Sequence, residues 1–421
     1  MKGFPAIQLL AYTLIALPVL FSACVKDNCK KEHTYVYYQP VFKTKNEVRA
    51  NIKSNAPRAI ETPGKICILG PTIFLNEPDR GIHIIDNTNP ARPRNIAFVD
   101  IPGNMDIAIK GNILYADLFT DLVALDISNP ADVKVKKIVE GVFPYRVYGN
   151  GFVQANNQDH IITEWVRRDT TVTESCSEGD VIVFFDSNVF LASSASGGTA
   201  SPVGKGGSMA RFTIMNNRLY TVGTDDLDVF NITNAADPVH GNRVSVGWNI
   251  ETIYPFKNNL FIGSQTGMFI YNVTNPDVPV QAGQFSHVRS CDPVIADDNY
   301  AYVTLRSGNV CQGFTNELDI VKLNNLSNPA LQKVYPLTNP HGLSKDGDLL
   351  FICDGKDGLK VYNAANVMSL QLISTIGTID AYDVIAMDHI ALTVAKDGLY
   401  QYDYSDPVNI RLLSKLTVAP K

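Results

Sequence analysis

One phrase of apolar positions followed by turn-forming residues recurs along the chain. Each copy holds a short apolar or alternating run that ends at Asp or Asn and is followed by a Ser/Thr-Asn-Pro tail or a variant of it. Such a run is typical of a buried strand that leads into a hairpin. Asn and Asp hydrogen bond to nearby backbone and Pro fixes φ, so the tail should end the strand and reverse the chain. The copies are Gly81–Pro90, Leu122–Pro130, Leu227–Asn234, Met268–Pro276, Leu318–Pro329, Leu359–Asn366 and Leu399–Pro407.

A second strand signal precedes each copy, and a further apolar run follows it. At Lys110–Tyr115 and Lys257–Phe261 a turn with Gly or Asn, which tolerate positive φ, leads into an aromatic-containing run. The repeating unit therefore has four strands. The anchors Asp86 and Asp126 lie 40 residues apart, and a four-strand repeat of about 40–45 residues is the period of a β-propeller blade. One blade cannot bury both of its faces alone, so neighbouring blades must stack.

The number of anchors predicts the number of blades. We expect an all-β protein, a β-propeller of eight four-stranded blades, over residues 63–421. The unit around Asp186 is the least regular, so a seven-bladed ring with this unit partly extruded is the alternative. Two long intervals predict loop insertions at 156–180 and 307–317, each between the second and third strands of a blade. The anchors are Asp86, Asp126, Asp186, Asn231, Asn272, Asn324, Asn363 and Asp403.

The repeated phrases carry a family resemblance. LVALD and GIHIID, with their Asn-Pro tails, resemble the LVIVD-repeat family, β-propeller-like bacterial proteins that are secreted or lipid-anchored. The resemblance covers the chain from Pro63 to Val418. It implies the fold, and it implies no common activity.

The first residues have the pattern of a targeting segment. Lys2 supplies a positive start and Phe4–Phe21 is apolar. The following Phe-Ser-Ala-Cys sequence resembles a lipobox, the cleavage site of bacterial lipoproteins. The resemblance implies that residues 1–23 are a signal peptide and that Cys24 is lipidated. We therefore expect an outer-membrane-anchored lipoprotein of the cell envelope, periplasmic or surface-exposed; a plain signal peptide with an incidental cysteine is the alternative.

Residues 24–62 separate this segment from the repeats. Val25–Glu32 is charged and short, which is typical of a tether, and Thr34–Thr44 is aromatic and strand-like. We expect this N-terminal segment to pack on the ring near the place where the last blade meets the first. Such packing would cover edges that an open ring leaves unpaired.

Composition and missing motifs exclude several classes of function. An apolar content of 45% and an aromatic content of 9% fit one large β domain, here expected to be monomeric. The net charge of −6, without a basic run, argues against nucleic acid. No C-x-x-C, G-x-S-x-G or H-E-x-x-H pattern occurs, so we expect no metal and no cofactor. The Gly/Ser-rich stretch Ser193–Ser208 lacks the spacing of a phosphate loop and predicts a flexible connection.

The seven cysteines fit an oxidising compartment. Cys291 opens a strand and Cys311 lies in the inserted loop of the same blade, so we predict a Cys291–Cys311 disulfide that pins this loop. Cys67 and Cys353 lie within strand patterns and are expected to be small buried residues.

The candidate site follows from the propeller fold. Loops that lead into the innermost strands gather on one face, together with the loops between second and third strands, and ligands bind where many loops converge. The corresponding positions here are polar and predict a ring of mixed charge that binds a polar ligand. Solvated loop residues, or pairs that neutralise one another across a wet channel, are the alternative. The candidates are Asp106, Arg146, Arg211, Glu251, Asp292, His341 and Asp383.

Three functions are consistent with these features. The first is a binding or scaffold module for a glycan, a peptide or a protein partner, with no catalytic residue. The second is a hydrolase or lyase acting on a polysaccharide or peptide, with two acids at the channel mouth. The acids that could supply such a pair are Asp106, Glu251, Asp292 and Asp383. The third is adhesion through Trp165, which stands beside Arg167 and Arg168 in the first insertion. The same tryptophan is equally suited to cap its own loop.

Overall fold

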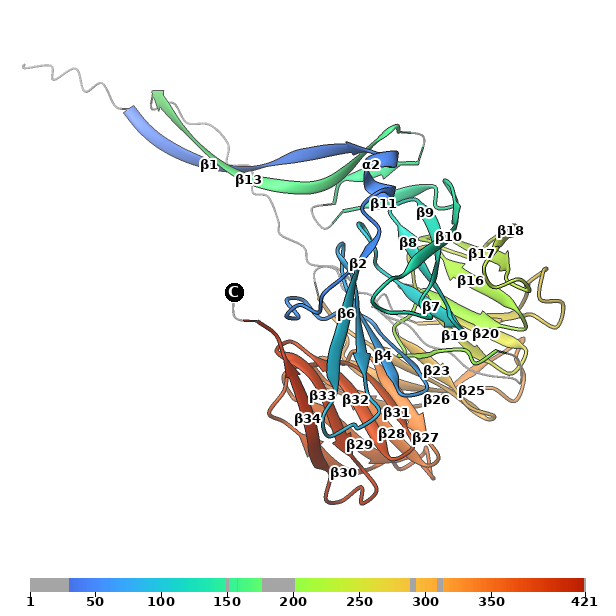
Figure 1. Ribbon diagram of the computed structural model, residues 1–421. Helices are drawn as coiled ribbons and strands as arrows, with labels where there is room; N and C mark the ends of the chain where they lie inside the picture. The colour runs from blue at the N-terminus through green and yellow to red at the C-terminus, as the bar shows by residue number, and fades with distance from the viewer. Residues whose placement is uncertain are drawn as a thin grey trace, which may run out of the picture. The chain divides into compact units, whose positions relative to one another are not determined.

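Seven blades of four antiparallel strands make up the repeats in the described part of the chain, and two further short strands extend the sheet of blade 1. The computed structural model describes residues 30–148, 151–156, 158–175, 201–287, 293–308 and 313–419. The four strands of each blade come from one contiguous stretch of the chain, and the blades follow one another around a central axis from blue to red in Figure 1. The described chain is therefore a β-propeller, with blades numbered 1 to 7 in chain order.

The blades share one order of strands, from the axis outwards. The first strands, whose neighbours contact one another around the axis, are β3 (Ile66–Leu69), β7 (Ile107–Lys110), β15 (Phe212–Met215), β19 (Ile250–Phe256), β23 (Val294–Ala296), β27 (Leu343–Asp346) and β31 (Ala381–Met387). The second strands are β4 (Thr72–Glu77), β8 (Ile113–Leu118), β16 (Arg218–Val222), β20 (Asn259–Ser264), β24 (Tyr300–Leu305), β28 (Leu349–Cys353) and β32 (Ile390–Ala395). The third strands are β5 (Gly81–Asp86), β9 (Asp121–Asp126), β17 (Asp226–Asn231), β21 (Gly267–Asn272), β25 (Glu317–Lys322), β29 (Leu359–Asn363) and β33 (Gly398–Asp403). The outermost strands are β6 (Arg94–Asp100), β10 (Lys134–Val139), β18 (Val239–Ser245), β22 (Val280–Ser286), β26 (Ala330–Pro336), β30 (Gln371–Ile376) and β34 (Arg411–Thr417).

The recurring sequence phrase forms the third strand of a blade and the turn after it. Asp86 is the last residue of β5, and its Oδ1 accepts a hydrogen bond from the Thr88 N–H (3.0 Å). Asn89 then accepts one from the Ala91 N–H (3.1 Å), so two side chains fix the backbone of the reversal. The prediction that these side chains close a turn is confirmed. Equivalent turns begin at Asp126, Asn231, Asn272, Asn363 and Asp403.

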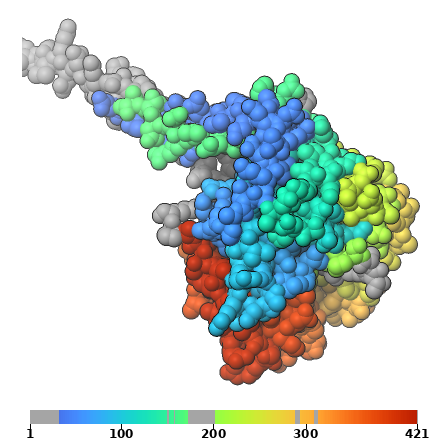
Figure 2. All heavy atoms as spheres, in the orientation of Figure 1, coloured from blue at the N-terminus to red at the C-terminus, as the bar shows by residue number. Residues whose placement is uncertain are grey.

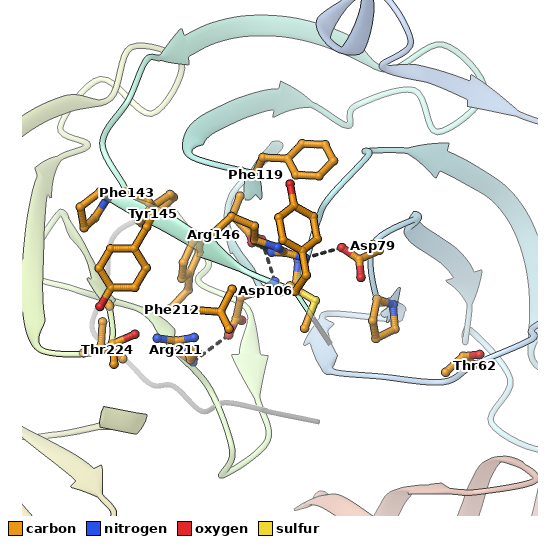
Figure 3. Close-up of a pocket in the computed structure, with 18 residues that line it drawn as sticks. Thr62, Asp79, Asp106, Phe119, Phe143, Tyr145, Arg146, Arg211, Phe212 and Thr224 are labelled. Carbon is orange, nitrogen blue, oxygen red and sulfur yellow. Dashed lines mark hydrogen bonds and ion pairs between the residues drawn. The ribbon is translucent and has the colours of Figure 1, made fainter. Parts of the chain in front are cut away.

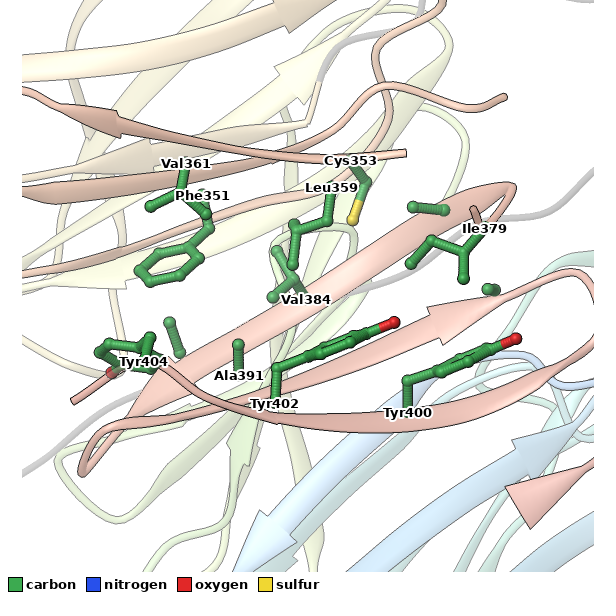
Figure 4. Close-up of a cluster of buried hydrophobic side chains, with 13 residues drawn as sticks. Phe351, Cys353, Leu359, Val361, Ile379, Val384, Ala391, Tyr400, Tyr402 and Tyr404 are labelled. Atoms are coloured by element: carbon green, nitrogen blue, oxygen red, sulfur yellow. The ribbon is translucent and has the colours of Figure 1, made fainter. Parts of the chain in front are cut away.

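Hydrophobic side chains fill the space between neighbouring blades. Between blades 6 and 7, Phe351 and Leu359 belong to one cluster with Val384, Tyr402 and Tyr404 (Figure 4). Full burial of one such side chain stabilises the fold by about 1.5–3 kcal/mol. The core is thus distributed around the ring, with such clusters also between blades 2 and 3, 3 and 4, 4 and 5, 5 and 6, and 7 and 1.

The last blade packs against the first without sharing a strand with it. Ile66 and Ile73 of blade 1 lie in one buried cluster with Ile385 and Val394 of blade 7. The side-chain amides of Asn87 and Gln401 exchange two hydrogen bonds across the junction (2.9 and 2.7 Å). The blue and red parts of the ring are in direct contact in the space-filling view (Figure 2). Side-chain packing and these amides therefore close the ring.

Part of the N-terminal segment lies along blades 1 and 2. Strand β2 (Lys53–Asn55) pairs with β6 on the outer edge of blade 1. Ile60 forms a parallel bridge with Val418, after the last strand, and accepts the Ala419 N–H (2.7 Å). The five-residue helix α2 (Lys45–Arg49) precedes β2. No helix among the described residues is long and apolar enough to cross a lipid bilayer.

The expected number of eight blades is wrong, and the alternative of seven is correct. The stretch between β10 and β15 contributes β11 (Tyr145–Val147) and β12 (Val153–Ala155), which pair only with each other, and β13 (His160–Ser175), which pairs with β1 (Lys30–Thr44). Asp186 lies outside the described residues. The 156–180 insertion therefore lies between two blades rather than within one, whereas 307–317 joins the second and third strands of blade 5. Spacing alone could not show that this stretch finds its strand partners outside a blade.

Strands β1 and β13 form a two-stranded ribbon, most of which is a compact unit of its own. Thr34 Oγ1 hydrogen bonds to Thr171 Oγ1 (3.1 Å), and Arg168 Nε donates to Gln39 Oε1 (3.4 Å). These pairs give strands that run in opposite directions, as Figure 1 shows. The expected strand at Thr34–Thr44 is confirmed.

Candidate functional site

Polar residues surround the channel at the end where the first strands begin, which we call the mouth face. Glu251 lies in β19 and Asp383 in β31. Asp106 and Arg211 directly precede β7 and β15, and His341 lies two residues before β27. Lys65 takes the same place before β3, a residue that the sequence analysis missed although it precedes Ile66 as Asp106 precedes Ile107. Asp292 lies outside the described residues. The described ring is Lys65, Asp106, Arg211, Glu251, His341 and Asp383.

A segment of the chain, Pro202–Ala210, passes through the channel, and we call it the plug. It begins at the far end of blade 2, where Pro202 O accepts the Gly111 N–H (2.8 Å). It then forms β14 (Lys205–Gly206), which pairs with β3 on the axis side of blade 1. It ends at the mouth face, where Ala210 O accepts the Ile253 N–H of blade 4 (2.6 Å). The expectation of a flexible connection is therefore wrong for residues 201–208.

The plug fits because glycine occupies its tightest positions. A Cβ at Gly204 would lie 2.5 Å from Cys67 Sγ, and one at Gly207 would lie 2.5 Å from Asp383 Cγ. Ser208 Oγ accepts the Leu343 N–H (2.7 Å), which ties the plug to blade 6. The Gly/Ser composition therefore reflects close packing inside a channel.

Several charges of the ring are committed to the fold. Lys65 forms a buried ion pair with Asp106, each 2% exposed. Asp106 Oδ2 also accepts the Arg211 N–H (2.8 Å), which fixes the point where the plug enters blade 3. Burial lowers the pKa of Lys65, while Asp106 opposes this shift. Asp383 is buried beneath the plug, and desolvation raises its pKa to about 7.

A hollow of about 330 Å³ opens on the mouth face beside blades 1, 2 and 3, and we call it the blade 1–3 hollow. Arg146 of β11 lies in it, with its guanidinium directed at Asp79 in an ion pair (Figure 3). The same guanidinium lies 3.6 Å from Asp117 Oδ2. Arg146 was expected to precede a first strand; it comes instead from the stretch between blades and still reaches the mouth. Aromatic rings complete the lining, from Phe119, Phe143, Tyr145, Tyr148 and Phe212.

Arg211 lines the same hollow and has a different environment. Its Nε is buried without a hydrogen-bond partner, and its guanidinium forms no ion pair with any described residue. Burial lowers its pKa, although Asp106, Asp117 and Glu251 attract the charge. Arg211 is therefore a cation held near acidic groups without direct contact.

A second hollow, of about 490 Å³, opens on the mouth face beside blades 5, 6 and 7, and we call it the blade 5–7 hollow. Arg306 follows β24, and His341 precedes β27. Met209 of the plug lines this hollow, whereas Arg211, two residues later, lines the other. The two hollows therefore lie on either side of the end of the plug.

Comparison with known proteins agrees with the repeat architecture. Residues 103–140 match the LVIVD repeat, and they comprise blade 2 with the loop that leads into it. The chain is a β-propeller that contains an LVIVD repeat. No curated protein has a significantly similar sequence.

Solved structures resemble this propeller in fold alone. A computationally designed protein, Ika8, superposes with a TM-score of 0.50 at 8% identity, over 86% of this chain and 90% of the other. A protein from Lactobacillus plantarum superposes with a TM-score of 0.51 at 12% identity, over 85% of this chain and 97% of the other. Identities this low carry no information about ligands.

The remaining candidate residues belong to the ribbon of β1 and β13 or lie outside the described residues. Trp165, in β13 of the ribbon, is half-buried rather than exposed, and the exposed Arg167 pairs with Asp169 (3.3 Å). Cys24, Cys291 and Cys311 lie outside the described residues. Within the described ranges no group of His, Cys, Asp and Glu is arranged to hold a metal ion.

The expectation that Cys67 and Cys353 are buried is confirmed. Both are free thiols, with exposures of 2% and 0%. Burial raises the pKa of each thiol. These cysteines therefore serve packing, and in their positions they are protected from reagents in solution.

Proposed function

We propose that this propeller is a binding module that holds a polar ligand, a glycan or a peptide, in the blade 1–3 hollow. A β-propeller of repeats is in general a binding or scaffold module, because its variable loops converge on one face. The observation that carries the proposal is the lining of this hollow. Five aromatic residues and the charged side chains of Asp79, Asp117, Arg146 and Arg211 surround one space.

This lining has the chemistry that polar, carbon-rich ligands require. Aromatic faces pack against the apolar face of a sugar ring or against a peptide side chain, while carboxylates and guanidinium groups bind hydroxyls and amides. Arg146 is fixed by Asp79 and Asp117, so it loses little freedom when a ligand arrives. The volume of about 330 Å³ lies at the lower end of the range of small-ligand sites. It fits one or two residues of a longer chain.

Binding assays on a blocked hollow test this proposal. Thr224 lines the hollow and is half-buried, so Thr224→Arg would fill the space without breaking an ion pair (Figure 3). Thr274 is an exposed threonine in the turn after β21, and Thr274→Arg is the matched control. We expect the protein to bind members of a glycan and peptide array, Thr224→Arg to weaken binding at least tenfold, and Thr274→Arg to leave it unchanged. Equal binding by the two variants, or an array without any binder, would exclude this site.

The buried carboxylates do not favour the hydrolase alternative. A general acid must reach the bond that it protonates. Asp106 and Asp383 are each 2% exposed, and Glu251 is 7% exposed. Asp106 is further committed to Lys65 and to the Arg211 N–H. We therefore advance binding alone.

The location of this module forms part of the same proposal. The lipobox-like sequence before Cys24 supports an outer-membrane lipoprotein whose contact with the membrane is its lipid anchor, with the propeller in the periplasm or at the cell surface. Metabolic labelling with palmitate in a bacterial host tests this. The wild type should carry the label and sediment with membranes, and Cys24→Ser should lose both properties. A labelled Cys24→Ser variant would refute lipidation at this residue.

A further inference from the structure

The blade 5–7 hollow presents charged and polar groups that the proposed function does not use. It shares no lining residue with the blade 1–3 hollow, and its volume of about 490 Å³ lies within the range of small-molecule sites. Its polar lining comes from three blades and consists of Arg306, Thr338, Asn339, His341, Lys356 and Asp380.

Arg306 is the central feature of this hollow, because its charge has no ion-pair partner among the described residues. The side chain is half-buried, and its guanidinium forms no hydrogen bond and no ion pair with the described residues. Burial lowers its pKa, while Glu251 and Tyr382 attract the charge and oppose this shift. A desolvated guanidinium without a carboxylate costs stability. Such a cost is typical of a group kept for a ligand.

The wall that faces Arg306 is held rigid by hydrogen bonds. Asp354, which is fully buried, accepts the backbone N–H groups of Thr338 (3.1 Å) and Asn339 (2.7 Å). Lys360 donates to the same carboxylate (2.5 Å) and balances its charge. Asn339 Nδ2 lies 3.2 Å from His341 Nε2. The polar groups at positions 339 and 341 are therefore positioned before any ligand binds.

His341 adds a neutral polar edge rather than a charge. Burial lowers the pKa of His341 to about 3, and the nearby charge of Arg306 is the second cause of this shift. Its ring packs edge-on against Tyr382, with centroids 5.2 Å apart. The hollow therefore has two cations, Arg306 and the exposed Lys356, and one anion, Asp380, which leaves one net positive charge.

We propose that the blade 5–7 hollow binds a small polar molecule through a single carboxylate group, with Arg306 as its ion-pair partner. A planar guanidinium matches a carboxylate through two parallel hydrogen bonds. One net positive charge suits a carboxylate better than the doubly charged form of phosphate. Met209 and the Tyr382 ring supply apolar surface for the carbon skeleton of the ligand. This proposal does not depend on which ligand occupies the other hollow.

Calorimetry with a defined set of probes tests the proposal. The probes are glucuronate, N-acetylglycine and lactate as carboxylates, with glucose and inorganic phosphate for comparison, all at pH 7.5 and low salt. Arg306→Gln removes the charge, and Arg92→Gln, at an exposed arginine in the outer turn of blade 1, is the matched control. We expect at least one carboxylate to bind, glucose and phosphate to bind at least tenfold more weakly, and Arg306→Gln but not Arg92→Gln to weaken carboxylate binding at least tenfold.

Stability and pH provide two further readouts. Because Arg306 has no ion-pair partner among the described residues, Arg306→Gln without ligand should melt at the wild-type temperature or above, whereas replacement of a structural arginine would lower the melting temperature. Carboxylate affinity should be constant from pH 5.5 to 8, since neither the ligand nor His341 changes charge there. The proposal fails if no carboxylate binds, if phosphate binds more tightly, if Arg306→Gln binds as the wild type does, or if that variant is clearly destabilised.

Discussion

The plug offers the sharpest test of how this propeller is held together. Gly207 lies inside the channel, and a Cβ there would lie 2.5 Å from Asp383 Cγ, 2.8 Å from Oδ1 and nearer still to Oδ2. Asp383 is buried and receives the backbone N–H of Ser208, so it cannot swing away cheaply. Overpacking a core costs about 1–3 kcal/mol. Replacing glycine also restricts the unfolded chain, which offsets about 0.4–1 kcal/mol. Gly207→Ala should therefore lower the free energy of unfolding by about 1–2 kcal/mol.

A double-mutant cycle separates this clash from other effects. Asp383→Ala removes all three atoms that the new methyl group would meet, so Gly207→Ala should cost almost nothing in that background. The coupling energy should be about 1–2 kcal/mol. Gly377→Ala is the control, because its Cβ would meet nothing closer than 3.9 Å. The assay is reversible urea denaturation followed by circular dichroism. If Gly207→Ala were as stable as Gly377→Ala, or if Asp383→Ala gave no rescue, the plug would not pack as described.

Three further predictions concern charge and burial. The pKa of Asp383 is raised to about 7, above the unfolded value near 4, so this carboxyl group destabilises the fold as the pH rises from about 4 to about 7. Asp383→Asn should therefore gain stability relative to wild type over that window, by at most about 4 kcal/mol at pH 8. If the urea midpoints of the two proteins changed in parallel at all pH values, the shift in pKa would be disproved. Arg49→Gln should lower the free energy of unfolding by about 1–3 kcal/mol, because Arg49 pairs with the buried Asp121 (2.6 Å). Arg94→Gln, which breaks the exposed pair with Asp86, should lower it by less than about 1 kcal/mol. Equal urea midpoints for the two variants would contradict this. With the other cysteines replaced by serine, Cys67 and Cys353 should react with a thiol reagent only after unfolding, and rapid labelling of the native protein would show that they are accessible.

The blade could be predicted from the sequence because its signals are local. The phrase that ends at Asp86 contains both the strand and the side chain that closes its turn two residues later. The register of the first strands is local too, so it placed Asp106 and His341 at the mouth face without knowledge of their neighbours. Lys65 stands in the same register and could have been found in the same way.

The number of blades and the character of the candidate site depended on contacts between distant residues. The stretch between β10 and β15 resembled an irregular blade, yet β13 pairs with β1, more than a hundred residues earlier in the chain. The sequence of the plug resembles that of a flexible linker, because a Gly/Ser-rich composition suits both a flexible loop and a tightly packed segment inside a channel. Arg306 gave no sequence signal, since its importance lies in the lack of an ion-pair partner among the described residues, which the sequence does not show.

The repeats therefore specified the sheets, their turns and the face on which polar groups gather, because each of these depends on residues a few positions apart. Only the folded ring decided which of those polar groups are used up by one another and which remain open to a ligand. Lys65 neutralises Asp106 and the plug buries Asp383, whereas Arg211 and Arg306 are left without an ion-pair partner among the described residues. The physical reason is that pairing and burial of charge are set by proximity in space, which a period of forty residues does not encode.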